Sequence, residues 1–202
     1  MGAGRNKALF LDRDGVINED KGYVYQPELF EFKQGIFDLC RAAQSLGYLL
    51  IVVTNQAGIA RGYYSESDFQ DLTCWMASRF AEKGVHISQV YYCPHHPVAG
   101  VGKYKCDSPD RKPNPGMLLR AESDLNLDLR SSILIGDKLS DIQAANTAGV
   151  GTVILLQSDG SQMKRDQCQV FGSLEEIQQS LFPQKPTFVD RGVQTTTEHG
   201  FN

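Results

Sequence analysis

Short apolar runs alternate along the chain with longer segments whose apolar positions recur at helical spacing. The apolar runs are Ala8 to Leu11, Leu49 to Val53, Val90 to Tyr92, Ile133 to Ile135 and Val153 to Leu156. Helical spacing is present over Ile36 to Leu46, Ser65 to Phe80, Asn114 to Leu125, Ser140 to Ala148 and Ser173 to Leu181. Continuous short runs are typical of strands that are buried on both faces. The alternation therefore predicts an α/β fold with a mostly parallel sheet and helices on both faces.

Polar side chains follow three of the predicted strands directly. Asp12 and Asp14 come after the first strand, Thr54 and Asn55 after the second, and Asp137 after the fourth. In an open parallel sheet, ligands bind beyond the carboxyl ends of the strands. We therefore expect these side chains to converge on one site.

The three aspartates offer hard oxygen ligands to a divalent cation. Mg²⁺ suits such a site best, because it keeps waters that a phosphate group can replace. A carboxylate can also attack phosphorus directly. Two acids one residue apart on an extended chain point in different directions, so we predict that Asp12 attacks while Asp14 handles the proton. Considered alone, the pair is equally typical of a solvated acidic turn.

Phosphoryl transfer also needs hydrogen-bond donors and positive charge around the phosphate. Thr54 and Asn55 supply donors, Lys112 supplies a point charge, and Arg111 supplies a fork that suits a second phosphate. Each pair alone is also explained by an ordinary turn or a solvated basic surface. The order of all of them along the predicted strand ends favours a phosphate site.

Composition limits the class of protein. A chain of 202 residues with 41% hydrophobic and 22% charged residues is typical of one globular domain, which we assign to residues 1–182, with a loosely ordered tail over 183–202. The net charge of -4 argues against a nucleic-acid partner. No apolar run is long enough for a signal peptide or a membrane span, and five cysteines predict no disulfide framework. We expect a cytoplasmic monomer without a membrane partner.

The ordered motifs resemble those of the haloacid dehalogenase (HAD) superfamily of phosphohydrolases. They read Asp12-Arg13-Asp14-Gly15-Val16, Thr54-Asn55, Lys112 before Pro113, and Gly136-Asp137-Lys138-Leu139-Ser140-Asp141. The resemblance implies a doubly wound, Rossmann-like sheet. It implies that Asp12 is the nucleophile, Asp14 the acid and base, Thr54 and Lys112 the stabilisers of the phosphoryl group, and Asp12, Asp14 and Asp137 the Mg²⁺ ligands. Only about 40 residues separate Asp14 from Thr54, which leaves no room for a large cap domain.

Within that superfamily, the stretches 12–18, 54–62, 93–97 and 111–117 resemble the heptose 1,7-bisphosphate phosphatases. The resemblance implies a small phosphorylated sugar as substrate, losing its 7-phosphate on the route to bacterial surface polysaccharide. The substrate-binding residues it implies are Arg13, Asp20, Lys21, Gly22, Tyr23, Asn55, Gln56, Ala57, Arg61, Arg111 and Lys138. Histidinol-phosphate phosphatases share most of these motifs, so another small phosphate ester remains an alternative. A phospho-accepting signalling domain is a further one, opposed by the second acid Asp14.

The same resemblance implies a structural zinc in the loop before Arg111, bound by Cys-x-His and Cys-x-Cys. Cys93 and His95 match the first pair, but the second pair reads Ser108 and Asp110. Serine is a poor zinc ligand because its hydroxyl stays protonated at neutral pH. Two interpretations stay open. One is a zinc site made of Cys93, His95, Cys106 and either Asp110 or His96. The other is a proline-stiffened loop without metal.

Overall fold

A six-stranded, wholly parallel sheet forms the centre of the computed structural model, which describes residues 4–157 and 167–183. The strands are β1 (Lys7–Leu11), β2 (Tyr48–Asn55), β3 (Ile87–Cys93), β4 (Ile133–Gly136), β5 (Thr152–Leu156) and β6 (Gln169–Phe171). Their spatial order is β3-β2-β1-β4-β5-β6. After β1, the chain adds β2 and β3 on one side of β1, and it later adds β4, β5 and β6 on the other side. Ligands bind at this kind of switch point in doubly wound sheets.

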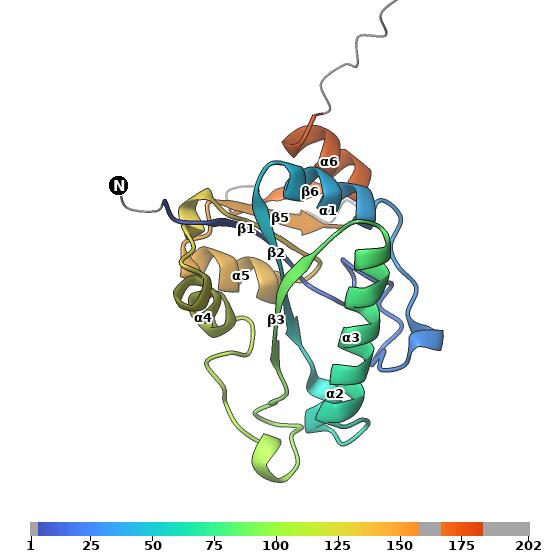
Figure 1. The fold of residues 1–202 in the computed structure, drawn as a ribbon. Coiled ribbons are helices and arrows are strands. Elements are labelled where there is room, and N and C mark those ends of the chain that lie inside the picture. Colours follow the sequence, from blue (N-terminus) through green and yellow to red (C-terminus); the bar gives the residue numbers. More distant parts are fainter. Residues whose placement is uncertain (1–3, 158–166, 184–202) are drawn as a thin grey trace, which may run out of the picture.

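Helices cover both faces of the sheet. The α-helices are α1 (Ile36–Ser45), α2 (Ala57–Ala60), α3 (Glu66–Glu82), α4 (Gly116–Leu125), α5 (Leu139–Ala148) and α6 (Leu174–Leu181). Short 3-10 helices span Pro27–Leu29, Gly102–Tyr104 and Leu129–Ser131. Figure 1 shows α4 and α5 on one side of the sheet and α3 on the other.

Two apolar clusters explain this layering. Leu9 and Leu11 of β1 pack with residues of α1, α3 and α6, whereas Ala8 and Phe10 pack with residues of α4 and α5. Because alternate side chains of a strand point to opposite faces, one short strand joins both clusters. The apolar run Ala8 to Leu11 of β1 follows from burial on both sides, and it ends at Asp12, a buried carboxylate.

The predicted fold class is confirmed, and the five predicted strands and five predicted helices are all present, with shifted ends. The third strand is longer than its apolar run, because it begins at Ile87 and continues through the polar residues Ser88 and Gln89, which are partly buried and exposed, respectively. The edge strand β6 has no fully buried residue, which explains why no apolar run predicts it.

The predicted tail and the predicted lack of a membrane span concern the whole chain, whereas the structure describes residues 4–157 and 167–183. Apart from Pro183, the predicted tail over 183–202 lies outside them, so the division at residue 182 stays a prediction. None of the helices within 4–157 and 167–183 combines the length and apolar character needed to cross a bilayer.

Candidate active site

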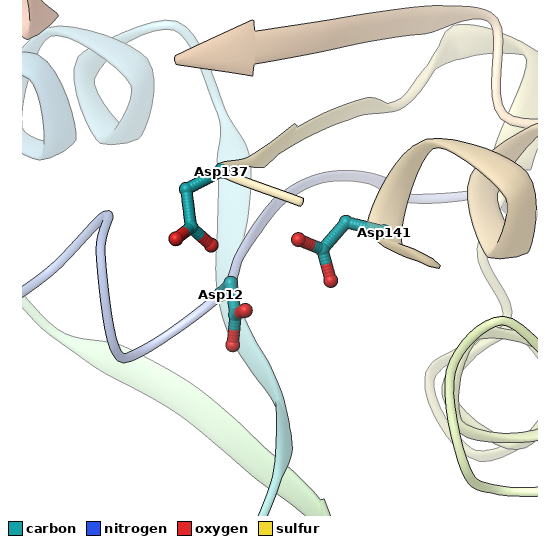
Figure 2. Close-up of side chains that lie close together, drawn as sticks. All are labelled: Asp12, Asp137 and Asp141. Atoms are coloured by element: carbon teal, nitrogen blue, oxygen red, sulfur yellow. The ribbon is translucent and has the colours of Figure 1, made fainter. Parts of the chain in front are cut away.

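Three carboxylates meet at the carboxyl edge of the sheet. Asp12 directly follows β1, Asp137 directly follows β4, and Asp141 lies in the first turn of α5. Strands β1 and β4 are parallel neighbours, so both open at the same edge. One oxygen from each carboxylate lies within 4.8 Å of the other two. Figure 2 shows the three side chains turned toward a common space, which we call the acidic centre.

Two glycines allow this close approach. Gly15 has a φ of +96°, and a Cβ added there would lie 2.2 Å from Oδ2 of Asp137. A Cβ added to Gly136 would lie 2.3 Å from the Cβ of Asp141. Any larger residue at either position would displace one of the acids, so both glycines are needed for the geometry of the acidic centre.

Burial opposes ionisation at the acidic centre. It raises the pKa of Asp12 to about 7, with Lys112 working against the rise and Asp141, Asp137 and Asp14 adding to it. Burial likewise raises the pKa of Asp137 to about 6. Nζ of Lys112 lies 3.0 Å from Oδ2 of Asp12 and 2.6 Å from Oδ1 of Asp141. Nζ of Lys138 lies 3.7 Å from Oδ2 of Asp137. Two ammonium groups therefore face three carboxylates, and further positive charge is needed to balance them.

The acidic centre fits a hard divalent cation. Among the residues that the structure describes, Oδ1 of Asp137 is buried and accepts no hydrogen bond, which is costly unless a cation takes that place. Its three members offer only carboxylate oxygens, the ligands that Mg²⁺ prefers. No other cluster of three His, Cys, Asp or Glu side chains in the described part of the chain is close enough to hold a metal ion.

Asp14, which we predicted to have a separate role, has a different set of partners. Its Oδ1 accepts hydrogen bonds from Nη2 of Arg13 at 2.9 Å and Nδ2 of Asn18 at 3.0 Å, and its Oδ2 accepts one from Nε2 of Gln56 at 3.3 Å. Arg13 is buried and also donates to the carbonyl of Val24. The guanidinium of Arg13, a predicted substrate ligand, is thus engaged in holding Asp14.

A cavity of about 480 Å³ opens above these groups. The residues that line it are Asp12, Asp14, Asp20, Gly22, Tyr23, Thr54, Asn55, Gln56, Ala57, Tyr64, Arg111, Lys112, Lys138, Ser140 and Asp141. Most of the predicted catalytic and substrate-binding residues are therefore in one place. The predicted residues outside this lining are Arg13, Lys21, Arg61 and Asp137. Lys21 forms an exposed ion pair with Glu31, and Asp137 lines a neighbouring hollow together with Gly15.

Reciprocal hydrogen bonds fix the basic segment of the cavity against β2. Nδ2 of Asn55 donates to the carbonyl of Lys112 at 2.9 Å, and the backbone N–H of Lys112 donates to Oδ1 of Asn55 at 3.1 Å. Nζ of Lys112 also donates to the carbonyl of Val53. Nη1 of Arg111 donates to the carbonyl of His95 at 3.0 Å. These contacts place both cations at the cavity. The Lys112 ammonium is shared among Val53, Asp12 and Asp141, whereas the Arg111 guanidinium uses one nitrogen on the carbonyl of His95.

The rim of the cavity joins segments that are far apart in the sequence. Nζ of Lys138 lies 2.9 Å from Oδ2 of Asp20, which links the segment after β1 to the start of α5. Gly22 and Tyr23 both have positive φ angles, +73° and +53°. The turn they form carries the ring of Tyr23 to an edge-on contact with Tyr63, with 4.7 Å between ring centroids.

The comparisons with known proteins agree with this geometry. A HAD-hydrolase-like family model matches residues 110–180. Over 152 residues, which are 75% of this chain and 80% of the other, the chain is 62% identical to a D-glycero-alpha-D-manno-heptose-1,7-bisphosphate 7-phosphatase of Burkholderia mallei. The chain belongs to the heptose-bisphosphate 7-phosphatase family. As a member of this family it is a phosphatase, a phosphoric monoester hydrolase.

Two further members of the family support this assignment. A beta-anomer 7-phosphatase of Vibrio cholerae is 52% identical over 75% of this chain and 81% of its own. The solved structure of a D,D-heptose 1,7-bisphosphate phosphatase from B. bronchiseptica, complexed with magnesium and phosphate, is 27% identical. That structure superposes with a TM-score of 0.73 over 86% of this chain and 99% of its own.

The candidate zinc ligands are less closely grouped than the acidic centre. Sγ of Cys93 is buried and lies 3.9 Å from Nδ1 of His95, but Cys106 is exposed. Oδ2 of Asp110 is paired with Nη1 of Arg120 at 2.9 Å. In the described chain these side chains form no group of three ligands close enough to share an ion. The geometry therefore favours the loop without metal.

Sequence reasoning missed two buried members of the candidate active site, Asp141 and Tyr64. Asp141 stands inside the Gly136-to-Asp141 motif, at the third position of α5, where its Oδ2 accepts a hydrogen bond from the backbone N–H of Lys138. That motif position is the signal that identifies it. Tyr64 lies outside every motif, and its contact with Gln56 depends on how α2 folds. No local pattern predicts that contact.

Proposed function

We propose that this phosphatase hydrolyses the 7-phosphate of D-glycero-D-manno-heptose 1,7-bisphosphate in a Mg²⁺-dependent reaction that passes through an aspartyl-phosphate on Asp12. The observation that carries the proposal is the buried contact of Asp12 with Lys112 beside Asp137 and Asp141, with Asp14 on a separate set of partners at the same cavity. The names of the relatives support the choice of substrate. The family resemblance supports a cytoplasmic role in making heptose precursors of surface polysaccharide.

The reaction consists of two displacements at phosphorus. A carboxylate oxygen of Asp12 attacks, the bond between phosphorus and O7 of the sugar breaks, and Asp14 gives its proton to the leaving oxygen. Water then attacks phosphorus while Asp14 takes a proton from it. The bond between phosphorus and Asp12 breaks, which releases inorganic phosphate and restores both carboxyl groups to their starting state.

Lys112 and Thr54 face the oxygens of the phosphoryl group during both steps. The Lys112 ammonium is held 3.0 Å from Asp12, so it lies beside the oxygen that attacks and reduces its repulsion from the phosphate. Asp12, Asp137 and Asp141 are the side chains that would hold Mg²⁺ at this edge. When bound, Mg²⁺ supplies the positive charge that neutralises both the carboxylates and the incoming phosphate.

The far side of the cavity selects a bisphosphate. Arg111 is half-buried at the cavity with one guanidinium nitrogen on the carbonyl of His95, which leaves the rest of the fork for an anion. Lys138 and Asp20 lie together on the lining, and their charged and hydrogen-bonding groups suit the hydroxyls of a sugar. These positions support a substrate with one phosphate at Asp12 and a second at Arg111.

Phosphate release from a panel of esters tests the proposal. The panel holds the alpha and beta anomers of heptose 1,7-bisphosphate, fructose 1,6-bisphosphate and histidinol phosphate, each with and without Mg²⁺. We expect multiple turnovers, a requirement for Mg²⁺ and the highest kcat/KM for a heptose bisphosphate. Comparable values on all four esters would refute the heptose assignment. A single stable phosphorylation without turnover would refute hydrolysis.

A further inference from the structure

A buried tyrosine is joined to the catalytic groups by hydrogen bonds. The hydroxyl of Tyr64 donates to Oε1 of Gln56 at 2.6 Å. Nε2 of Gln56 donates to Oγ1 of Thr54 at 2.8 Å and to Oδ2 of Asp14 at 3.3 Å. Gln56 is 1% exposed and Tyr64 is 7% exposed. A continuous path of hydrogen bonds therefore connects Tyr64 with two residues of the proposed reaction.

The tyrosine decides which way the amide of Gln56 faces. An amide has one accepting oxygen and one donating nitrogen, and both Thr54 and Asp14 accept from Gln56. The oxygen must then face a donor, because a buried carbonyl without a partner is costly. Burial raises the pKa of Tyr64 to about 12, so its hydroxyl keeps its proton and supplies that donor.

The direction of the amide fixes the direction of the Thr54 hydroxyl. Since Oγ1 of Thr54 accepts from Gln56, its own hydrogen is left to donate to another group. Thr54 lines the same cavity as Asp12, where a phosphoryl oxygen would be the acceptor. Donors that are already aimed at a developing charge stabilise the transition state at little cost in reorganisation.

The ring of Tyr64 is held tightly in this place. It stacks on Tyr25 with 5.2 Å between centroids and 7° between ring planes. A Cβ added to Gly58 would lie 2.1 Å from Cε1 of Tyr64, so the ring lies directly on the backbone of α2. Removing only the hydroxyl should therefore leave the ring where it is.

We propose that Tyr64 is a positioning residue, which acts through Gln56 to aim the Thr54 hydroxyl and to hold Asp14 for phosphoryl transfer. The proposal rests on the proposed function, because it assumes that phosphorus reacts beside Thr54 and Asp14. Tyr64 itself transfers no proton and contacts no reacting atom.

Tyr64→Phe tests the proposal against a matched control. We expect kcat to fall roughly 3- to 10-fold, the effect of one hydrogen bond, with KM changed less than about 2-fold. Tyr91→Phe is the control, since Tyr91 is 5% exposed and its hydroxyl donates to Asp124 of α4, away from the cavity. The control should keep its kcat. An unchanged kcat in Tyr64→Phe, or an equal loss in both variants, would overturn the proposal.

A double-mutant cycle tests whether Tyr64 acts through Gln56. In Gln56→Met, which keeps the length of the side chain but loses the amide, adding Tyr64→Phe should cost nothing further in kcat. The same fold loss in both backgrounds would contradict the proposed path. A second readout needs no substrate: the Gln56 side-chain amide protons should exchange with solvent slowly in the wild type and at least several-fold faster in Tyr64→Phe. Equal exchange overturns the positioning role even if the heptose assignment fails.

Discussion

Lys112 places a positive charge next to the buried carboxylates of Asp12 and Asp141. It is 4% exposed, and burial alone would lower its pKa, but Asp12 and Asp141 raise that pKa above its ordinary value. The side chain therefore stays charged beside the carboxylate of Asp12, the proposed nucleophile, at any physiological pH. Because its ammonium is shared between two acids and the carbonyl of Val53, it has little freedom to move during the reaction. A fixed charge at this point is what a phosphoryl-transfer site requires.

Asp12→Asn should abolish turnover while the fold stays intact. The amide keeps the shape of the side chain but cannot attack phosphorus, so we expect kcat to fall by roughly 10³-fold or more. Removing one of three crowded carboxylates also relieves repulsion, so the melting temperature without Mg²⁺ should be unchanged or higher. Phosphate-release kinetics and thermal melts check the two parts. Substantial residual turnover would show that Asp12 is not the nucleophile.

Arg111→Ala should lower kcat/KM more for a bisphosphate than for a simple phosphate ester. If its guanidinium binds a second phosphate, kcat/KM for the heptose bisphosphate should fall about 10- to 100-fold, the range of charged hydrogen bonds. A simple phosphate ester offers Arg111 no second phosphate, so its kcat/KM should change by less than about 3-fold. Arg111→Lys keeps the charge but loses the planar fork of the guanidinium. Its kcat/KM for the heptose bisphosphate should lie between those of the wild type and Arg111→Ala. Equal losses on both substrates would contradict the second-phosphate role.

Whole elements place these residues, and elements are what the sequence pattern predicts best. Strands β1, β2 and β4 are apolar on both faces, so their runs stand out, and the acids and donors that follow them share one edge. The edge strand β6 is short and partly exposed, and its pattern is that of a loop. The Gly136-to-Asp141 motif contains Asp141 but does not show its contact with Lys112, whereas Tyr64 lies outside every motif and contacts Gln56 across elements. Spacing along one strand or helix cannot encode such contacts.

The loop between β3 and α4 yields a prediction about metal content. Glu66 of α3 accepts hydrogen bonds from the hydroxyls of Tyr92 and Tyr104, and Asp110 pairs with Arg120 of α4. The contacts of Tyr104 and Asp110 fasten the loop to both neighbouring helices, and that of Tyr92 joins β3 to α3. We expect protein purified without chelator to contain substoichiometric zinc, and a zinc-selective chelator to leave its melting temperature unchanged while Mg²⁺ is present.

The matched variant for that loop is Ser108→Cys with Asp110→Cys. It restores a Cys-x-Cys pair opposite Cys93 and His95, and it should acquire about one zinc per chain. Metal analysis of both proteins gives the comparison. Stoichiometric zinc in the wild type that disappears in Cys93→Ser would instead establish a native zinc site in this loop.

At the scale of the whole molecule, folding assembles a centre that the unfolded chain does not contain. The sheet brings Asp12 and Asp137 together from distant parts of the sequence, and α5 adds Asp141. Burial in the fold then raises the pKa of Asp12 and of Asp137 above their ordinary values. The free energy of unfolding therefore depends on the protonation of these two groups and on whatever cation neutralises them.

The stability of the Mg²⁺-free protein should fall as the pH rises from about 5 to about 7.5. Since the pKa values are raised to about 7 for Asp12 and about 6 for Asp137, the folded state binds more protons than the unfolded state in this range. Stability is then lost as pH rises through the folded pKa values. Mg²⁺ binds the ionised carboxylates, so it should raise the melting temperature more at pH 7.5 than at pH 5.

Thermal melts in EDTA and in Mg²⁺ at both pH values measure this dependence, with Asp12→Asn as the control. His96 has a lowered pKa and contributes the opposite slope, but it is present in both proteins, so their difference isolates Asp12. The control should show a flatter dependence on pH and a smaller gain from Mg²⁺. If instead the wild type in EDTA is as stable at pH 7.5 as at pH 5, and Mg²⁺ stabilises it equally at both, then the carboxylates are not crowded in solution. In that case the acidic centre would not be the place where the cation binds.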